Sequence, residues 1–378
     1  METEGSYFDF VLPTKVKFGP GKRKHLISEV ESRGFKSIGI VTNEIIRDLG
    51  LLEDVENDLR ENREVNLFTG VESNPHLSTV SGGYNEFHGK ELDCLVGIGG
   101  GSVIDTTKAI SLCLANGEED IVQLDQSSER IEPSLPFFAL PTTSGTGSEV
   151  DYWAVISKPE TNEKLSIGCP EMGPLTAIVD PELTVTLPPE LTFSTGIDAL
   201  SHALEAFLSA ESNDLSDTLA LKAIDLVFES LESAIDNGKN LKARGDMSLA
   251  STLGGAAMQH VGLGLVHAMS HQISGFYDAN HGLTNAKLLQ PVLEFNREAV
   301  PDKLRVLEKE FDNRFAEKME NLLNLYDYSN FQLELNKKDL PELVERAVKN
   351  VNAKTNPRPA NRGEVRRIYK TSFDIADE

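Results

Sequence analysis

Short apolar runs alternate with amphipathic segments over the first half of the chain. The runs end at asparagine, glycine, threonine or proline, and they occupy residues 37–43, 92–101, 136–143 and 175–181. Segments with helix-like spacing separate them, as in the stretch that begins near Glu44. Uninterrupted apolar runs of this length are typical of strands buried on both faces. The pattern therefore predicts an α/β domain with a mostly parallel sheet that helices cover on both sides.

The second half of the chain has a different pattern. From about residue 188, long amphipathic stretches follow one another with few β-branched runs, which predicts an all-α domain. The paired prolines of 'LPPE' (187–190) interrupt regular structure between the two halves. We therefore expect an α/β domain at 1–187 and a helical domain at 188–378.

Two loops rich in glycine and hydroxyl residues follow two of the predicted strands. In 'VGIGGGSVIDTTKA' (96–109), glycines let the backbone approach a ligand, and a helix opening at Ser102 presents free N–H groups. In 'LPTTSGTGSEV' (140–150), hydroxyls and glycines follow the next strand. Either loop alone also fits a capped turn without a ligand. At the carboxyl ends of neighbouring strands, however, the pair is expected to clasp one dinucleotide.

The residue expected to contact the cofactor ribose is Asn43. It ends an early strand, where dinucleotide folds often carry an acid that bonds the 2′-hydroxyl. A neutral amide can bond a hydroxyl but does not repel a 2′-phosphate. The sequence therefore leaves both NAD and NADP open.

Histidines recur at helical spacing in the second half. His267 and His271 are four residues apart, as are Asp198 and His202, so each pair lies on one face of a helix. His281, in 'NHG', stands at a predicted helix start. A lone histidine is commonly an ordinary, partly buried residue. Two such pairs beside a dinucleotide-like half predict instead a site for Zn²⁺ or Fe²⁺, which imidazole and carboxylate ligands suit.

Composition and charge exclude several other classes of protein. The net charge of −24 argues against binding to nucleic acids and to anionic membranes, which both need basic surfaces. No apolar run approaches the length that spans a bilayer, and the acidic N-terminus lacks the pattern of a secretory signal. The three cysteines are widely spaced and outside any CxxC motif. These features predict a cytoplasmic protein whose cysteines are buried thiols.

Taken together, the motifs resemble those of the iron-dependent (group III) alcohol dehydrogenases, in the dehydroquinate synthase-like superfamily. The resemblance runs from 'LPTKVKFGPGK' to 'TNPRPANRGEVRRIY', so it covers nearly the whole chain. It is carried by 'GGGSVIDTTKA', 'LPTTSGTGSEV', 'STGIDALSHALEA', 'HAMSHQISGFYDANHG' and 'TNPR'. The motif 'HAMSHQISGFY' is similar in sequence to that of the lactaldehyde:propanediol oxidoreductases. The implied fold is a dinucleotide-binding α/β domain followed by an all-α domain.

The resemblance also implies which residues form the site. One divalent metal would be bound by Asp198, His202, His267 and His281, with His271 beside it as a catalytic proton relay. The implied substrate pocket contains Trp153, Met258 and Asn352. The implied cofactor residues are Asn43, Asn74, Gly99, Gly100, Gly101, Ser102, Asp105, Thr142, Thr143, Thr146 and Lys164. The family usually has aspartate at the Asn43 position, so strict use of NAD does not follow from the resemblance.

The function that the resemblance implies is hydride transfer between a nicotinamide cofactor and a short-chain alcohol or aldehyde. The metal would be Fe²⁺, with Zn²⁺ as an alternative on the same ligands. Relatives of this kind are commonly dimers or larger, which implies a homo-oligomer. A glycerol dehydrogenase-like enzyme and a dehydroquinate synthase-like lyase are the alternatives within the superfamily. A non-catalytic binding protein on the same fold would be expected to have lost a metal ligand or a glycine, and none is missing here.

Overall fold

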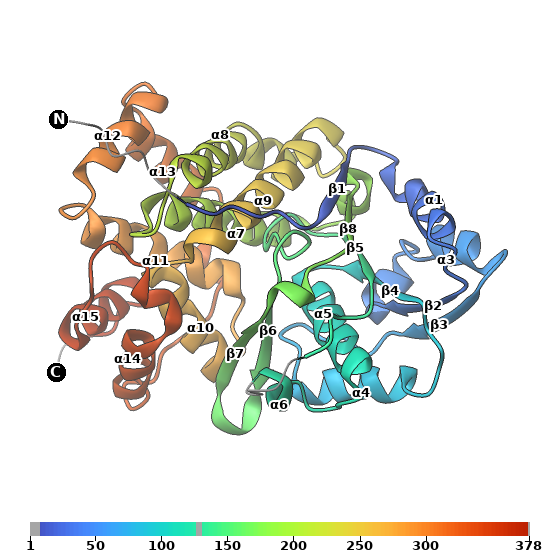
Figure 1. Ribbon diagram of the computed structural model, residues 1–378. Coiled ribbons are helices and arrows are strands. Elements are labelled where there is room, and N and C mark those ends of the chain that lie inside the picture. The colour runs from blue at the N-terminus through green and yellow to red at the C-terminus, as the bar shows by residue number, and fades with distance from the viewer. Residues whose placement is uncertain (1–7, 126–130, 377–378) are drawn as a thin grey trace.

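The computed structural model describes residues 8–125 and 131–376. A parallel sheet with its helices lies at one side of the molecule and a bundle of helices at the other, with a β-hairpin between them (Figure 1). The sheet has six strands in the order β1-β8-β5-β4-β2-β3, and all neighbouring strands pair in parallel. Its strands are β1 (Lys15–Phe18), β2 (Ser37–Val41), β3 (Glu64–Phe68), β4 (Cys94–Gly99), β5 (Phe137–Pro141) and β8 (Thr176–Val179).

The sheet is buried on both faces because alternate residues of its strands enter two different cores. On β4, Val96 and Ile98 pack on one face with α1 (His25–Ser32) and α3 (Glu53–Arg60). Leu95 points to the other face, with α4 (Leu77–Phe87) and α5 (Gly101–Asn116). Two short helices, α2 (Glu44–Asp48) and α6 (Ile121–Asp125), complete this half. A side chain on either face is thus removed from water, which explains the uninterrupted apolar runs.

The four predicted apolar runs are strands β2, β4, β5 and β8, so the parallel sheet is confirmed. The sequence did not predict β1 and β3, which lie at the two edges of the sheet. In β3 only Val65 is fully buried, and in β1 no residue is. Edge strands pair on one side only and cover less of the core, so their sequences carry more polar residues.

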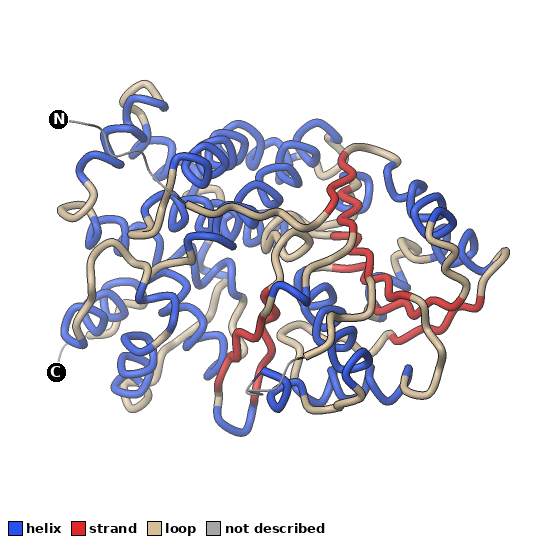
Figure 2. The backbone as a smooth tube through the Cα atoms, in the orientation of Figure 1, coloured by secondary structure: helices blue, strands red, loops and turns tan. Residues whose placement is uncertain are grey.

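The hairpin is a second small sheet that the sequence also did not predict. Its strands, β6 (Trp153–Lys158) and β7 (Glu163–Gly168), pair in antiparallel register. It projects between the two halves of the molecule, as the red strands at the centre of Figure 2 show. Only Ala154, Ile156, Ser157 and Ile167 are fully buried in it. The hairpin thereby forms a wall between the parallel sheet and the helical half.

The helical half begins at α7, where Pro189 occupies the first helical position, which suits its fixed φ and missing N–H. Its helices are α7 (Pro189–Leu208), α8 (Asp214–Asp236), α9 (Leu241–Val261), α10 (Leu265–Tyr277), α11 (His281–Asn296), α12 (Pro301–Glu310), α13 (Phe315–Leu323), α14 (Leu340–Lys349) and α15 (Arg362–Ser372). Short 3-10 helices are η1 (Lys22–Lys24), η2 (Pro159–Thr161), η3 (Pro170–Met172), η4 (Pro181–Thr184), η5 (Tyr328–Asn330) and η6 (Val351–Lys354). One large apolar cluster forms the core of these helices. The predicted change from α/β to all-α structure is confirmed, and the division into domains at residue 187 stays a prediction.

None of the helices in the described part of the chain combines the length and the hydropathy needed to cross a bilayer.

Candidate metal and dinucleotide site

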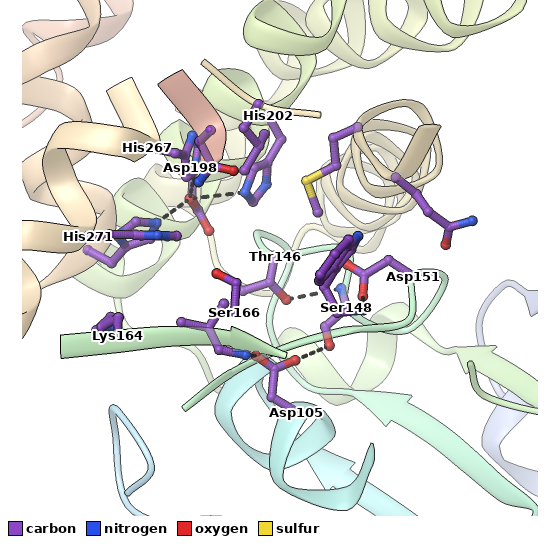
Figure 3. Close-up of a pocket in the computed structure, with 18 of the residues that line it drawn as sticks. Asp105, Thr146, Ser148, Asp151, Lys164, Ser166, Asp198, His202, His267 and His271 are labelled. Atoms are coloured by element: carbon purple, nitrogen blue, oxygen red, sulfur yellow. Dashed lines mark hydrogen bonds and ion pairs between the residues drawn. The ribbon is translucent and has the colours of Figure 1, made fainter. Parts of the chain in front are cut away.

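A cavity of about 350 Å³ lies where the glycine loops, the hairpin and the helical half meet. Figure 3 shows residues from all three parts pointing into it. Its lining includes the predicted metal residues, the predicted substrate residues and part of the predicted cofactor set. The predicted residues that line it are Asn74, Gly101, Ser102, Asp105, Thr146, Trp153, Lys164, Asp198, His202, Met258, His267, His271, His281 and Asn352. Residues predicted from separate motifs thus line the same cavity.

The predicted metal ligands gather around the Asp198 carboxylate. Its Oδ1 lies 3.7 Å from His202 Nε2, 3.5 Å from His267 Nε2 and 3.4 Å from His281 Nε2. Ligand atoms of Asp198, His267 and His281 all lie within 4.8 Å of one another. Four ligand atoms at bonds of about 2.1 Å around a tetrahedral ion would be roughly 3.4 Å apart. The spacing and the chemistry of these donors therefore fit a divalent metal ion.

Helix geometry explains this convergence. Asp198 and His202 stand one turn apart on α7, and His267 and His271 stand one turn apart on α10. His281 is the first residue of α11, immediately after its N-cap Asn280. The rings of His202 and His267 stack with centroids 4.5 Å apart. Three helices thus present ligands to one point without help from any loop side chain.

A carboxylate that the sequence did not single out orients one of these imidazoles. Glu205 Oε2 accepts a hydrogen bond from His267 Nδ1 at 2.6 Å, and its Oε1 accepts one from the Val266 backbone N–H at 2.6 Å. With Nδ1 donating to Glu205, Nε2 of His267 is the nitrogen left to bind a metal ion beside Asp198. Glu205 lies seven residues after Asp198 on α7, so helical spacing was the signal that could have found it.

Asn285 is a second neighbour of the cluster that the sequence did not single out. Its Nδ2 donates to Asp198 Oδ1 at 2.9 Å and lies 3.3 Å from Nε2 of both His267 and His281. It stands one turn after His281 on α11, so the i,i+4 rule that paired the other ligands also points to it. Asn285 therefore fixes the Asp198 carboxylate from the side of α11.

Charges within the cluster shift its proton affinities in opposite directions. Burial would raise the pKa of Asp198, but the imidazoles of His202, His281 and His267 hold it well below its usual value. Burial and the neighbouring His267 lower the pKa of His281 to about 3. Burial would also lower the pKa of His267, yet hydrogen bonds to Asp198 and Glu205 raise it to about 9. Asp198 is therefore ionised and His281 neutral, which are the forms of these two side chains that bind a metal.

His271 lies beside the ligand cluster without being part of its closest set. Its ring centroid is 5.3 Å from that of His281 and 5.9 Å from that of His267. Burial, with the neighbouring histidines, holds its pKa well below the ordinary value. Within the described residues its Nδ1 has no hydrogen-bond partner. A neutral, unpaired imidazole at the cavity wall suits the predicted proton relay.

The first glycine loop makes room for the second. The N–H of Thr142 donates to the carbonyl oxygen of Gly99 at 2.9 Å. A Cβ on Gly101 would lie 2.4 Å from Thr146 Cγ2, and one on Gly100 would lie 3.1 Å from Thr143 Cγ2. Gly100 caps α5 without any side-chain hydrogen bond, so the first N–H groups of this sixteen-residue helix have no side-chain cap. A bare helix N-terminus in a cradle that a Cβ would fill fits a pyrophosphate.

The second loop also connects to the helical half. Gly147, at φ +65°, approaches Gly255 of α9 so closely that a Cβ would meet its Cα at 2.6 Å. The Gly145 carbonyl oxygen accepts from His202 Nδ1 at 3.2 Å, which directs Nε2 toward Asp198. The loop predicted to hold the cofactor therefore orients a predicted metal ligand as well.

Other predicted cofactor residues bond within the protein. Asp105 accepts from Ser148 Oγ through one oxygen and from the Val155 N–H at 2.9 Å through the other. Asn43 caps α2, with Oδ1 accepting from the Ile46 N–H at 2.9 Å, and it does not line the cavity. Four further predicted cofactor residues lie outside the cavity lining: Gly99, Gly100, Thr142 and Thr143.

Lys164 and Asn74 meet at the cavity wall. Lys164 Nζ donates to Asn74 Oδ1 at 2.5 Å, and Asn74 Nδ2 donates to Asp278 Oδ1 at 2.6 Å. These bonds join β7, the segment before α4 and the end of α10. Burial lowers the pKa of Lys164 to about 8. The wall thus carries a cation whose charge changes near neutral pH.

Comparison with known proteins assigns the family. Residues 13–181 match the family described as iron-containing alcohol dehydrogenase, and residues 192–373 match the C-terminal part of the Fe-containing alcohol dehydrogenase family. Alcohol dehydrogenase 4 of Schizosaccharomyces pombe is 36% identical over 96% of this chain and 89% of its own length. The chain belongs to the iron-containing alcohol dehydrogenases. The predicted family and the predicted alcohol dehydrogenase and aldehyde reductase activity are therefore confirmed.

Two further proteins illustrate the similarity. The NAD-dependent methanol dehydrogenase of Bacillus methanolicus is 33% identical over 97% of this chain and all of its own length. A solved structure described as 1,3-propanediol oxidoreductase superimposes with a TM-score of 0.89 at 33% identity, covering 97% of this chain and 100% of the other. The fold predicted from the resemblance is therefore confirmed as well.

Proposed function

We propose that this chain is an NAD-dependent enzyme whose divalent iron is held by Asp198, His202, His267 and His281. Its substrates would be short primary alcohols, or the corresponding aldehydes in the reverse direction. The observation that carries the proposal is the cavity in which the uncapped N-terminus of α5 and the Asp198 cluster lie together. Names of relatives such as the NAD-dependent methanol dehydrogenase support the cofactor and the substrate class.

When bound, the ion supplies Lewis-acid polarisation of the substrate oxygen, and the nicotinamide takes or gives the hydride. The chain's own residues supply orientation and proton handling. Glu205 holds His267 in the tautomer that leaves Nε2 free, and Gly145 does the same for His202. His271 lies beside the cluster with an Nδ1 that is unpaired within the described residues, and its low pKa means that it would pass the hydroxyl proton of the alcohol on to water without retaining it.

The proposed cofactor contacts are the predicted glycine and threonine loops together with Asn74, Asp105 and Lys164. The proposed substrate wall is Trp153, Met258 and Asn352, which line the cavity from the hairpin, α9 and η6. Asn43 keeps NADP as an alternative cofactor, because its amide carries no charge to repel a 2′-phosphate. Zn²⁺ remains an alternative metal on the same donors.

An assay on metal-stripped protein tests this proposal. Fe²⁺ or Zn²⁺ is added back with NAD or NADP and a panel of short alcohols and aldehydes, and NADH or NADPH absorbance is followed. Turnover that requires both metal and nicotinamide is expected, fastest with Fe²⁺ and NAD. Bound metal and cofactor without turnover of any alcohol or aldehyde would favour the dehydroquinate synthase-like lyase.

We also propose that the chain forms a homodimer or a larger homo-oligomer in the cytoplasm. Among the described strands β1 pairs with β8 alone, so its other edge is available for pairing with a second copy. Light scattering after size-exclusion chromatography is expected to give at least twice the mass of one chain. A monomer at micromolar concentration would contradict this part of the proposal.

A further inference from the structure

A fully buried lysine lies beneath one wall of the cavity. Lys108, on α5, has no exposed surface. Its Nζ donates to Ser148 Oγ at 2.7 Å, to Asp151 Oδ1 at 2.5 Å and to the Trp153 carbonyl oxygen at 2.7 Å. An ammonium has three N–H donors, so all of them are used. The cofactor helix, the second loop and the start of the hairpin are therefore fixed to one another through a single charge.

The charges around this lysine do not balance. Lys108 Nζ lies 3.6 Å from Asp105 Oδ1 and 2.5 Å from Asp151 Oδ1, and no other lysine or arginine among the described residues forms an ion pair with either carboxylate. Asp105 and Asp151 thus share one cation. Both carboxylate oxygens of Asp105 accept hydrogen bonds, one from Ser148 Oγ and the other from the Val155 N–H. Asp151 uses Oδ1 for Lys108 and for the Trp153 N–H at 2.9 Å, and its side chain lines the cavity. Both carboxylates line the cavity, the Asp105 side chain 13% exposed and that of Asp151 4%, and with Lys108 they carry one net negative charge when both are ionised. Asp151 is the one of the two that bonds Trp153 of the proposed substrate wall.

The surroundings of Asp151 include no basic side chain that an anionic substrate could use. Among the described lining residues Lys164 is the one lysine or arginine, and the proposed function assigns it to the cofactor. Figure 3 shows Lys164 and Asp151 on opposite sides of the cavity. Trp153, 39% exposed, and Met258 provide apolar surface beside Asp151. The face of an indole also attracts cations.

We propose that Asp151 determines specificity at the far end of the substrate. It favours alcohols whose far end carries an ammonium or another cation, tolerates neutral ends, and disfavours a carboxylate. The physical reason is that a second negative charge would face Asp151 in a partly desolvated cavity without a compensating cation. The inference rests on the proposed function, because it names the substrate class of the same cavity.

The test compares three alcohols that share one carbon chain: aminopentanol, pentanol and hydroxypentanoate. We expect the kcat/KM of the native enzyme for aminopentanol to exceed that for hydroxypentanoate about 100-fold, since like charges in an interface cost several kcal/mol. In Asp151→Asn the amide can still accept from Lys108, but the charge is gone. The ratio should therefore fall at least about tenfold. A ratio within one enzyme cancels any general loss of activity.

Glu149→Gln is the matched control. Glu149 is also a buried carboxyl of the second loop, but it bonds Thr252 Oγ1 at 2.7 Å and does not line the cavity. Its variant should keep the native ratio. If Asp151→Asn does not fold, Asp151→Ser retains a hydroxyl acceptor for Lys108 and should show the same change.

A native ratio near one, or a ratio in Asp151→Asn within twofold of the native one, would overturn the inference. Absence of turnover with all three alcohols would count against the proposed function instead. The same ratio would then be measured from dissociation constants of the three alcohols by calorimetry, with the same expected change in Asp151→Asn.

Discussion

The metal cluster and the glycine loops line one cavity, yet they are built in opposite ways. The cluster consists of side chains from α7, α10 and α11 that meet at Asp198 Oδ1. The glycine loops are expected to contact the cofactor mainly through backbone N–H groups, and a Cβ at Gly101 would collide with the Thr146 side chain. In the first region the chemistry lies in the groups that are present, and in the second it lies in the space that absent side chains leave. A single substitution should therefore impair either metal binding or cofactor binding, but not both.

The largest expected effect is that of His267→Ala. This variant removes a ligand from the centre of the cluster, so metal content should fall well below one ion per chain and kcat/KM by at least about 1000-fold. NAD affinity should stay within a few-fold of the native value, because the loops of the α/β half are untouched. Metal analysis and calorimetric titration with NAD measure the two quantities.

His260→Ala is the control for this variant. The His260 ring stacks on Phe10 with centroids 3.9 Å apart, and His260 itself does not line the cavity. It should keep its metal and most of its activity. Full metal content and activity in His267→Ala would contradict the assignment of the cluster.

Glu205→Gln should weaken metal binding without removing a ligand. An amide N–H in place of Glu205 Oε2 would donate to His267 Nδ1 and favour the tautomer whose Nε2 carries the proton, which cannot bind a metal. We expect metal affinity to fall about 10–100-fold, as for other residues that orient a ligand. Competition with a chromophoric chelator measures it, and exposed Glu211→Gln is the control. Unchanged affinity would show that the His267 tautomer does not depend on Glu205.

The sequence predicted these regions to different extents. Strands β2, β4, β5 and β8 were predictable because burial on both faces leaves an uninterrupted apolar run. The edge strands and the hairpin were not, because half of their residues face solvent and their pattern is weak. Fold class thus followed from the residues that are most completely removed from water.

A similar limit applies to the site. The i,i+4 pairs on α7 and α10 revealed the cluster because histidine and aspartate at that spacing are metal ligands by type. Glu205, Asn285 and Lys108 were missed because they act through another residue, and their types are common on surfaces. Lysine in particular is almost never fully buried. Only the three-dimensional contacts distinguish Lys108 from a solvated lysine.

Gly101→Ala should produce the reverse of His267→Ala. Its Cβ would force Thr146 away and widen the cradle at the N-terminus of α5, so the dissociation constant of NAD should rise at least about tenfold. Metal content should not change. Gly82→Ala, on the exposed side of α4 where a Cβ would lie 3.7 Å from Phe68, is the control. Native NAD affinity in Gly101→Ala would mean that the cradle is not the cofactor site.

The smallest effect concerns Lys164, the one lysine or arginine among the described residues lining the cavity. Burial lowers its pKa to about 8, so it is protonated at pH 7 and largely neutral at pH 9. If the charged form contacts the cofactor phosphates, NAD affinity should fall by up to about tenfold between these two pH values, since about a tenth of the chains keep the charge one unit above the pKa. Lys164→Met should show the weaker NAD affinity at both pH values, and surface Lys90→Met should show the same pH dependence of NAD affinity as the native chain.

Calorimetric titration with NAD at pH 7, 8 and 9 separates these outcomes. An affinity that does not change with pH in the native enzyme would place the cofactor phosphates away from β7, and the backbone of the glycine loops would then hold them alone.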